Sequence, residues 1–423
     1  MVSEATVKRR RVFYIPGYDP IHPRRYRELY RTEGADQAAI SGYEIALKPK
    51  TEKGNYGWHV DATIDGVETE ADVEVLVWSD IVRGSMETGI PGTYLQLART
   101  SWLYIASGAL RRLMWLRKGP VIAALYPIVM LLLQLLVALV AGHIAGRIVS
   151  WLYSAIVGFF APLEAMGFVA GTLVPWAAYL GPFIGVLWFA LNWFKSKDGN
   201  LYAYYLMHDY AYSAQHGGAN PPELEVRMSE FGDMIAEALN DDVEEVLVVG
   251  HSSGAHLGVS ILADLIRQGR VSPAGPDLAF LSLGQVVPMV SFLPEAHRLR
   301  ADLQYLSTRD ELTWVDVTAP GDGCAFALCD PVAVSGVAPE GKKWPLVFSA
   351  AFTQTLSDEK WEKLKRRYFR LHFQYLCSFD RPKDYDYFQI TAGPVTLGSR
   401  YADRPPSRSR IDVPASKFTS VAA

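Results

Sequence analysis

A long apolar block in the middle of the chain limits the possible folds more than any other feature. Residues 119–194 contain only two formal charges, Arg147 and Glu164. Within the block, the Leu-rich stretch Pro120–Gly142 is long enough to span a bilayer. A second uncharged stretch, Ala165–Phe194, carries Gly and Pro, which membrane helices tolerate. The block therefore predicts a membrane hairpin rather than a soluble cap, which would need a polar outer face.

The overall composition argues against several functional classes. The chain of 423 residues has a formal net charge of -4, which gives no electrostatic reason to expect a nucleic-acid partner. No apolar segment follows the basic residues 8–11, so a cleavable secretory signal is not expected. The cysteines are too few for a disulfide framework and lack the spacing of zinc ligands, which favours ordinary thiols in a reducing compartment. They are Cys324, Cys329 and Cys377.

Strand-like runs alternate with helical patterns on both sides of the apolar block. The amphipathic segment that Pro221-Pro222 opens and that runs to Leu239, and the charged, aromatic segment Asp358–Tyr375, are expected to be helical. This alternation predicts an α/β fold, in which helices cover both faces of a mainly parallel sheet and a transmembrane helical hairpin is inserted. The expected strands are Arg11–Tyr18, Tyr43–Lys48, Trp58–Ile64, Val73–Val82, Val243–Val249, Leu278–Leu283 and Leu312–Val317.

The same patterns divide the chain into four parts. Residues 1–118 and 196–398 are expected to form one sheet-containing domain, and residues 119–195 form the hairpin inserted into it. Residues 399–423 are rich in Pro, Ser and Arg and are expected to be a disordered tail.

The position of the block also constrains the membrane topology. Strands on either side of it can share a sheet only if the number of crossings is even, and we expect two. Ile148–Leu163 is then not a separate crossing, but it can be the end of a long helix, an interfacial segment or a re-entrant piece. Basic residues at both outer ends of the block favour a cytoplasmic sheet domain. They are Arg111, Arg112, Arg117, Lys118, Lys195 and Lys197.

A Gly-x-Ser-x-Gly motif, Gly250–Gly254, lies between a buried-strand run and a helical pattern. A serine on such a sharp strand-to-helix turn has a strained backbone and needs small neighbours, which Gly250 and Gly254 provide. The N-terminus of the following helix favours the negative charge that forms during acyl transfer. The motif predicts Ser252 as a nucleophile; the alternative is a strand–helix junction that has no chemistry.

A serine nucleophile needs a general base, and the base needs an orienting carboxylate. In elbow-type enzymes the base follows the nucleophile in the chain, and of the nine histidines only His297 and His372 lie beyond the elbow helix. His297 lies in a polar connection that is typical of a solvated surface histidine. His372 is therefore the favoured base, and the alternative is a helix histidine that bonds a neighbouring side chain.

Three aspartates compete for the role of the acid. Asp322 follows the Leu312–Val317 strand in a Pro-Gly loop, from which a carboxylate can reach a histidine above the sheet. Asp316 lies inside the strand, and Asp330 before Pro331 is typical of a turn residue. We therefore favour Asp322.

An oxyanion hole needs two backbone N–H groups, and the expected donors are Ser253 and Tyr18. Pro16 cannot donate, and Gly17 lets the backbone approach a substrate closely. His251 and His256 straddle the turn and do not have the spacing of a zinc pair, so no metal ligands and no cofactor are expected.

A basic group near the oxyanion turn can bind an anionic head group, although a solvated surface is the simpler interpretation. The group comprises His22, Arg24, Arg25 and Arg27.

With nucleophile, acid and base found in this order, the chain resembles the α/β-hydrolase superfamily, its lipase- and esterase-like members in particular. The matching residues are Gly250–Gly254, Trp314–Asp322, His372 with Tyr375, and the strand-turn Phe13–Tyr18. One departure is Pro16-Gly17, where many relatives have His-Gly. The resemblance implies a serine hydrolase of esters that needs no cofactor, but it does not define the substrate.

Together these features predict a membrane-bound serine hydrolase that acts on an acyl ester, such as a lipid. Two alternatives stay open: an acyltransferase that uses the same serine, and a non-catalytic membrane scaffold with a hydrolase fold. The sequence indicates the lipid bilayer as a partner but does not indicate an oligomeric state.

Overall fold

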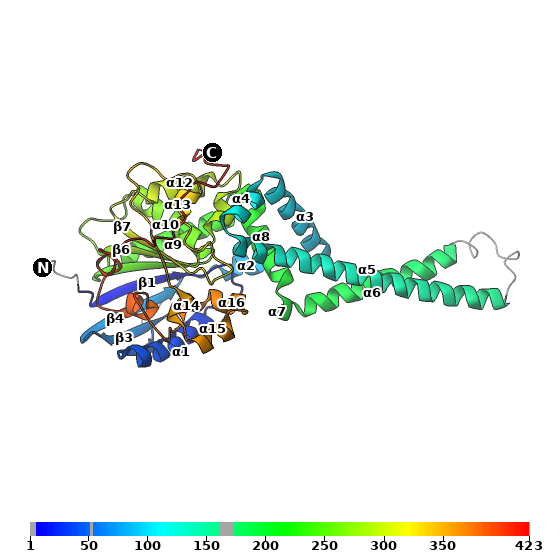
Figure 1. Cartoon of the computed structure of the whole chain (residues 1–423), viewed down its shortest axis with the longest axis horizontal. Helices are drawn as coiled ribbons and strands as arrows, with labels where there is room; N and C mark the ends of the chain where they lie inside the picture. The colour runs from blue at the N-terminus through cyan, green and yellow to red at the C-terminus, as the bar shows by residue number, and fades with distance from the viewer. Residues whose placement is uncertain (1–5, 51–53, 161–172, 423) are drawn as a thin grey trace. The chain divides into compact units, whose positions relative to one another are not determined.

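The computed structural model describes residues 6–50, 54–160 and 173–422, which form two compact units (Figure 1). The first comprises Met1–Ser85, Ser101–Ala123 and Tyr212–Ala423, and the second comprises Met86–Thr100 and Ala124–Ala211. The second unit, which is helical, therefore extends beyond the expected insertion of residues 119–195. It continues to Ala211 and also includes Met86–Thr100, which precede the apolar block. The physical reason is an apolar cluster in which the flanking helices pack against the two long ones. It includes Ile90, Leu97, Leu131, Leu191, Ala203 and Met207.

A single mixed sheet forms the centre of the first unit. Its strand order is β2-β3-β4-β1-β5-β6-β7-β8, in which β2, β3 and β4 pair antiparallel and all other neighbours pair parallel. This arrangement confirms the predicted α/β fold with a mainly parallel sheet. The strands are β1 Arg9–Ile15, β2 Glu44–Pro49, β3 Gly57–Ile64, β4 Val67–Val75, β5 Glu245–His251, β6 Asp277–Leu283, β7 Leu312–Thr318 and β8 Leu346–Ser349.

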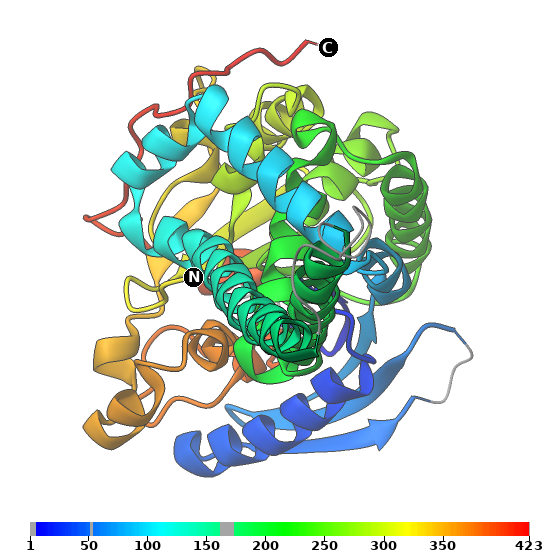
Figure 2. The same cartoon turned by 90° about the vertical axis from the view of Figure 1, so that its right-hand side faces the viewer.

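Helices cover both faces of the sheet, as Figures 1 and 2 show. On one face, α10 (Gly254–Arg267) contacts β5 and packs between α9 (Pro222–Ala238) and α12 (His297–Leu306). On the other face lie α1 (Arg24–Ser41) and α17 (Tyr387–Ala392), whose aromatic residues share an apolar core with alternate residues of the strands.

Most of the remaining helices are short, and the longer ones are α3, α5, α6 and α8. The bounds of all these helices are α2 Ser79–Ser85, α3 Ile90–Ala106, α4 Ala109–Leu116, α5 Lys118–Phe160, α6 Val174–Ser196, α7 Asp198–Leu201, α8 Ala203–Ala214, η3 Gln215–Gly218, α11 Val287–Ser291, α13 Pro331–Val334, α14 Phe352–Thr355, α15 Asp358–Leu364, α16 Tyr368–His372, η4 Gln374–Leu376 and α18 Leu397–Arg400.

Three local expectations differ from the structure. The run Val73–Val82 is not one strand, because β4 ends at Val75 and α2 begins at Ser79. The helix expected at Asp358–Tyr375 is broken into three short pieces, α15, α16 and η4. Strand β8 was not predicted, since its four residues directly follow Pro345 and are too short for an alternating pattern.

Residues 399–422 also differ from the disorder expected of them. Ser407 N donates to Val347 O, a bridge pairs Ile411 with Cys329, and Ala415 N donates to Val334 O. These backbone hydrogen bonds attach the segment to the β8 side of the sheet unit. The composition showed that this segment is polar. It could not show that the segment has hydrogen-bond partners far away in the sequence.

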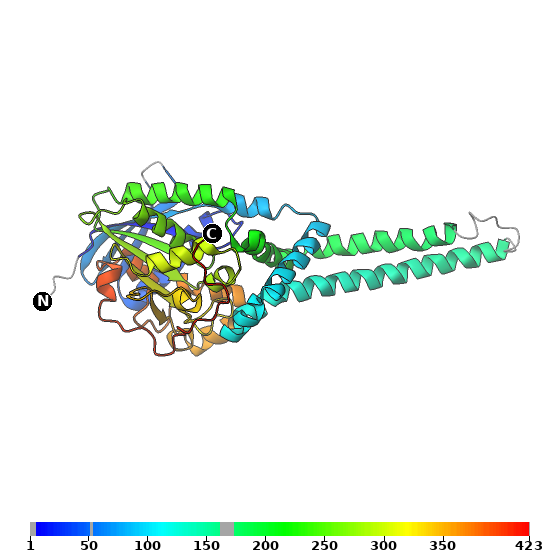
Figure 3. The ribbon, with the colours of Figure 1, turned by 90° about the horizontal axis from the view of Figure 1, so that it is seen from above.

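Helices α5 and α6 are long and apolar enough to cross a membrane. The mean hydropathy is 2.5 for Lys118–Val157 in α5 and 1.6 for Val174–Ser196 in α6. The two helices run side by side in Figures 1 and 3. Ile148–Phe160 continues α5, so the described part of that apolar segment is the end of a long helix. Residues 161–172, which include Glu164 and the start of the second predicted span, lie outside the described residues.

A small-residue pair brings the two long helices together. A Cβ added at Gly142 would lie 2.7 Å from Phe183 O, and one added at Gly146 would lie 2.8 Å from Tyr179 O. Gly142 and Gly146 therefore form a small-xxx-small contact that lets the two backbones approach closely. His143 Nδ1 lies 2.9 Å from the Tyr179 hydroxyl and adds a polar contact beside it.

Replacing Gly146 with leucine is expected to destabilise this helix pair by about 1–3 kcal/mol, because the added side chain overlaps the backbone of α6. The measurement is the thermal unfolding midpoint of the full chain in detergent. Gly181→Leu is the matched control, since a Cβ at Gly181 meets nothing within 4 Å. Equal midpoints for the two variants would contradict the close helix contact.

Candidate active site

Ser252 occupies a strained turn between a central strand and a helix. Its φ is 56°, in the left-handed region, and its N–H donates to Leu283 O over 2.9 Å. The turn is crowded: a Cβ added at Gly250 would lie 2.7 Å from Gly254 O, and one added at Gly254 would lie 2.1 Å from Ile15 O. The two glycines therefore let β5 enter α10 through a tight turn while α10 packs on the end of β1.

The predicted oxyanion donors lie in the two segments that border Ser252. Ser253 is buried at the start of α10, next to Ser252 in the chain. On the other side, a Cβ added at Gly17 would lie 3.0 Å from Ser252 Cβ and 3.4 Å from Ser252 Oγ. The turn containing Gly17 and Tyr18 thus passes directly beside the serine side chain.

Aromatic packing holds this turn in position. Trp78 Nε1 donates to Pro16 O over 3.0 Å, and the Trp78 ring meets the Tyr18 ring edge-on at 6.1 Å. The Tyr18 hydroxyl lies 2.5 Å from Ser85 Oγ. The Tyr18 side chain is therefore buried, and its hydroxyl contacts α2 through Ser85.

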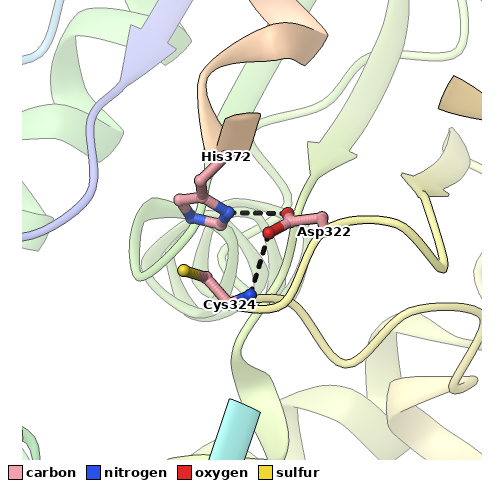
Figure 4. Close-up of side chains that lie close together, drawn as sticks. All are labelled: Asp322, Cys324 and His372. Carbon is pink, nitrogen blue, oxygen red and sulfur yellow. Dashed lines mark hydrogen bonds and ion pairs between the residues drawn. The ribbon is translucent and has the colours of Figure 1, made fainter. Parts of the chain in front are cut away.

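Asp322 and His372 form a buried pair at the carboxyl end of the parallel strands (Figure 4). Asp322 comes from the loop after β7 and His372 from the end of α16, and His372 Nδ1 lies 2.7 Å from Asp322 Oδ2. Two further donors hold the carboxylate: the Tyr375 hydroxyl reaches Oδ2 over 3.0 Å and the Cys324 N–H reaches Oδ1 over 2.9 Å. The pairing leaves Nε2 of His372 as the ring nitrogen that is not directed at the carboxylate.

The surroundings of Asp322 favour its ionised form. Burial alone would raise the pKa of this carboxyl, but the neighbouring His372 and the hydrogen bonds from His372, Cys324 and Tyr375 hold the pKa below its ordinary value. A carboxylate in this state can keep a proton on Nδ1 and stabilise an imidazolium.

The alternatives to this pair have other partners. Asp316 is buried in β7 and bonds Ser282 Oγ at 2.6 Å, and burial raises the pKa of its carboxyl to about 8. Asp330 caps the N-terminus of α13 and pairs with Lys342. His297 lies 3.4 Å from Ser420 O in the C-terminal segment. The structure therefore brings Asp322 and His372 together and leaves these three residues elsewhere.

Ser252 and His372 both border the turn that ends β6. The Ser252 N–H donates to Leu283 O, and a Cβ added at Gly284 would lie 3.1 Å from Cε1 of the His372 ring. Among the hydrogen bonds of the described residues, none joins the Ser252 hydroxyl to His372.

His251 contacts the main chain at His372, where α16 ends. Its Nε2 lies 2.9 Å from His372 O, and the two rings are 4.8 Å apart. Burial and the nearby His372 lower the pKa of His251 to about 3, so the ring is neutral and can donate to that carbonyl. Burial also lowers the pKa of His256 to about 4. The two histidines are thus buried, neutral neighbours of the turn.

The basic group near the oxyanion turn contributes one cation close to the site. The Arg25 guanidinium pairs with Asp19 at 3.0 Å and lies 4.7 Å from the ring centre of Phe373, which follows His372 in the chain. Arg27, by contrast, is partly buried and pairs with Glu28, the next residue in α1.

The loop of Asp322 packs against the start of α5. A Cβ added at Gly119 would lie 3.3 Å from Gly323 O, and Arg117 Nε donates to Ala327 O over 2.9 Å. The first turn of a helix long and apolar enough to cross a membrane is therefore in contact with the loop that carries the acid.

Three supporting contacts were not predicted from the sequence: the hydrogen bond from Tyr375 to Asp322, that between His251 and the His372 carbonyl, and the position of Cys324 beside the pair. Tyr375 had a weak signal, since it follows His372 by one helical turn, but the other two contacts depend on loops far apart in sequence. Asp322, Cys324 and His372 also form a group of side chains that could hold a metal ion.

Comparison with protein-family models, curated proteins and solved structures finds no match to this chain.

Proposed function

We propose that this protein is a membrane-anchored serine hydrolase of the α/β-hydrolase type, which cleaves an acyl ester through Ser252, His372 and Asp322. The observation that carries the proposal is the buried Asp322–His372 hydrogen bond of 2.7 Å beside a strained serine turn at the end of β5. A strained serine and an oriented histidine are the two components that a weak hydroxyl nucleophile needs.

In the proposed reaction Ser252 Oγ attacks the ester carbonyl while Nε2 of His372 takes the hydroxyl proton. The N–H groups of Ser253 and Tyr18 stabilise the negative oxygen that forms. His372 then returns the proton to the departing alcohol, which leaves an acyl group on Ser252. A water molecule, deprotonated by His372, attacks this acyl group, and the carboxylic acid departs as Ser252 regains its proton. Asp322 keeps its hydrogen bond to Nδ1 throughout and stays ionised.

The helical hairpin supports a site at the membrane surface. We place two crossings in α5 and α6, with the basic residues at their outer ends on the cytoplasmic side together with the sheet. Because the acid loop contacts Gly119 at the start of α5, the site would lie close to the level of the lipid head groups. A long-chain or lipid ester is the substrate class that this position favours.

The test is labelling of the purified full-length protein with a fluorophosphonate probe, which reacts covalently with activated serines. We expect the wild-type protein to be labelled and Ser252→Ala to lose the label, because the variant lacks the nucleophile. Ser253→Ala is the matched control, since its backbone N–H is kept and its hydroxyl has no role in the reaction.

Other outcomes point to the alternatives. If neither the wild type nor Ser252→Ala is labelled, the chain is a scaffold and the enzyme proposal is wrong. If the wild type is labelled, incubation of an ester with an added alcohol divides the two enzyme types, because a hydrolase releases mainly the free acid whereas a transferase releases mainly a new ester.

A further inference from the structure

Three different metal-binding side chains converge beside the proposed base. Asp322 and Cys324 come from the loop after β7, and His372 comes from α16, so the cluster forms only in the folded chain. One ligand atom from each residue lies within 4.8 Å of the other two. Figure 4 shows the Cys324 side chain extending toward the imidazole while the carboxylate approaches it from another side.

From this cluster we infer that Asp322, Cys324 and His372 form an inhibitory zinc site. A thiolate, an imidazole and a carboxylate are the three ligand types that zinc binds in proteins, and three protein ligands with water as a fourth are typical of open zinc sites. Ligand atoms around a tetrahedral zinc ion lie roughly 3.3–3.8 Å apart, given bond lengths of about 2.0–2.3 Å. Small side-chain movements from the distances in the cluster would reach this geometry.

The loop after β7 carries two of the three ligands, Asp322 and Cys324. Asp322 and Cys324 are separated by one residue, Gly323, and the Cys324 N–H bonds the Asp322 carboxylate. Asp322 is buried and Cys324 is partly exposed, so the cluster has a buried floor and a side that solvent can reach. Cys377 is chemically similar, but its Sγ lies near Phe373 O, at 3.3 Å, and it is not a member of the cluster.

Zinc bound here would compete directly with the proposed reaction. The ion would take the carboxylate and an imidazole nitrogen, so Asp322 could no longer orient His372 and His372 could no longer accept the serine proton. This consequence rests on the proposed function, whereas binding of the metal itself does not. The inhibition would be reversible, because a chelator can remove the ion.

The first experiment measures binding without reference to activity. The purified, chelator-treated full-length protein is titrated with Co²⁺, a spectroscopic substitute for zinc that gives a thiolate charge-transfer absorption band. We expect this band in the wild type and in Cys377→Ser, and its loss in Cys324→Ser and Cys324→Ala. A band that persists without Cys324, or no band in the wild type, would overturn the site.

The second experiment measures ester hydrolysis against zinc concentration, with each rate divided by the rate of the same variant in chelator. We expect saturating Zn²⁺ to reduce the wild-type rate at least tenfold. Cys324→Ser should need about tenfold more zinc for half-inhibition, since even indirect partners of a metal contribute about that factor. Equal zinc sensitivity in the two proteins, or cobalt binding without inhibition, contradicts the inhibitory role. A chain that lacks hydrolysis in chelator but gives the cobalt band refutes the proposed function and supports metal binding.

Discussion

The His372→Ala variant is expected to hydrolyse an ester about 10⁶-fold more slowly than the wild-type protein, because the proposed reaction would lose its general base. The Asp322→Ala variant should lose about 10⁴-fold, since His372 would keep its place but lose the carboxylate that orients it and stabilises its charged form. Both rates are measured as kcat on the purified protein in detergent.

Non-additivity provides a sharper test of the same site. If Ser252, His372 and Asp322 act as one unit, the double variant Ser252→Ala with His372→Ala should be no slower than either single variant. His297→Ala is the matched control, because this histidine bonds the C-terminal segment at Ser420 and its loss should change kcat less than about twofold. Rate losses that multiply in the double variant would contradict the triad.

The Gly254→Ala variant is expected to lose about 3 kcal/mol or more of its free energy of unfolding. The added Cβ would lie 2.1 Å from Ile15 O and 2.8 Å from Pro16 O, which are backbone atoms of β1 and of the turn after it. Neither side chain rotation nor a small local shift can relieve such an overlap, so α10 and β1 would have to separate. Chemical denaturation of the full chain, followed by circular dichroism, measures the loss.

A second glycine in a helix of the same unit provides the control for this variant. A Cβ added at Gly232 in α9 meets nothing closer than 4.0 Å, so Gly232→Ala should be neutral or stabilising by up to about 1 kcal/mol. If Gly254→Ala proves as stable as Gly232→Ala, the close approach of α10 to β1 is wrong. Activity offers a second readout, because the Pro16–Gly17 turn borders Ser252.

Several elements could be predicted from local pattern alone. The runs that became β1, β3, β5, β6 and β7 are apolar or alternating, and such runs form strands in most surroundings. The uncharged block likewise predicts long apolar helices whatever its neighbours are. By contrast, β8 has four residues after a proline, and β4 ends at Val75 inside an apolar run that continues to Val77. Short elements of this kind owe their conformation to tertiary contacts.

The candidate site divides in the same way. The motif Gly250–Gly254 and the order of residues along the chain led to Ser252, His372 and Asp322, and the hydrogen bond between the last two agrees with that pairing. The roles of Tyr375, His251 and Cys324 could not be predicted, because each depends on a contact between segments that only the folded sheet brings together. The boundaries of the helical unit escaped prediction for a related reason: α3 and α8 join it by packing rather than by hydrophobic length.

Local sequence patterns were sufficient to predict the α/β fold, the long apolar helices and the candidate nucleophile, since periodicity, charge and small residues act over a few neighbouring positions. That Asp322, not Asp316 or Asp330, meets His372, and that Cys324 lies beside them, became evident in the folded chain. The fold also brings the acid loop against Gly119 at the start of α5. The physical reason is that such choices depend on the lateral order of parallel strands. That order places loops from distant parts of the chain at one edge of the sheet, and no local pattern encodes it.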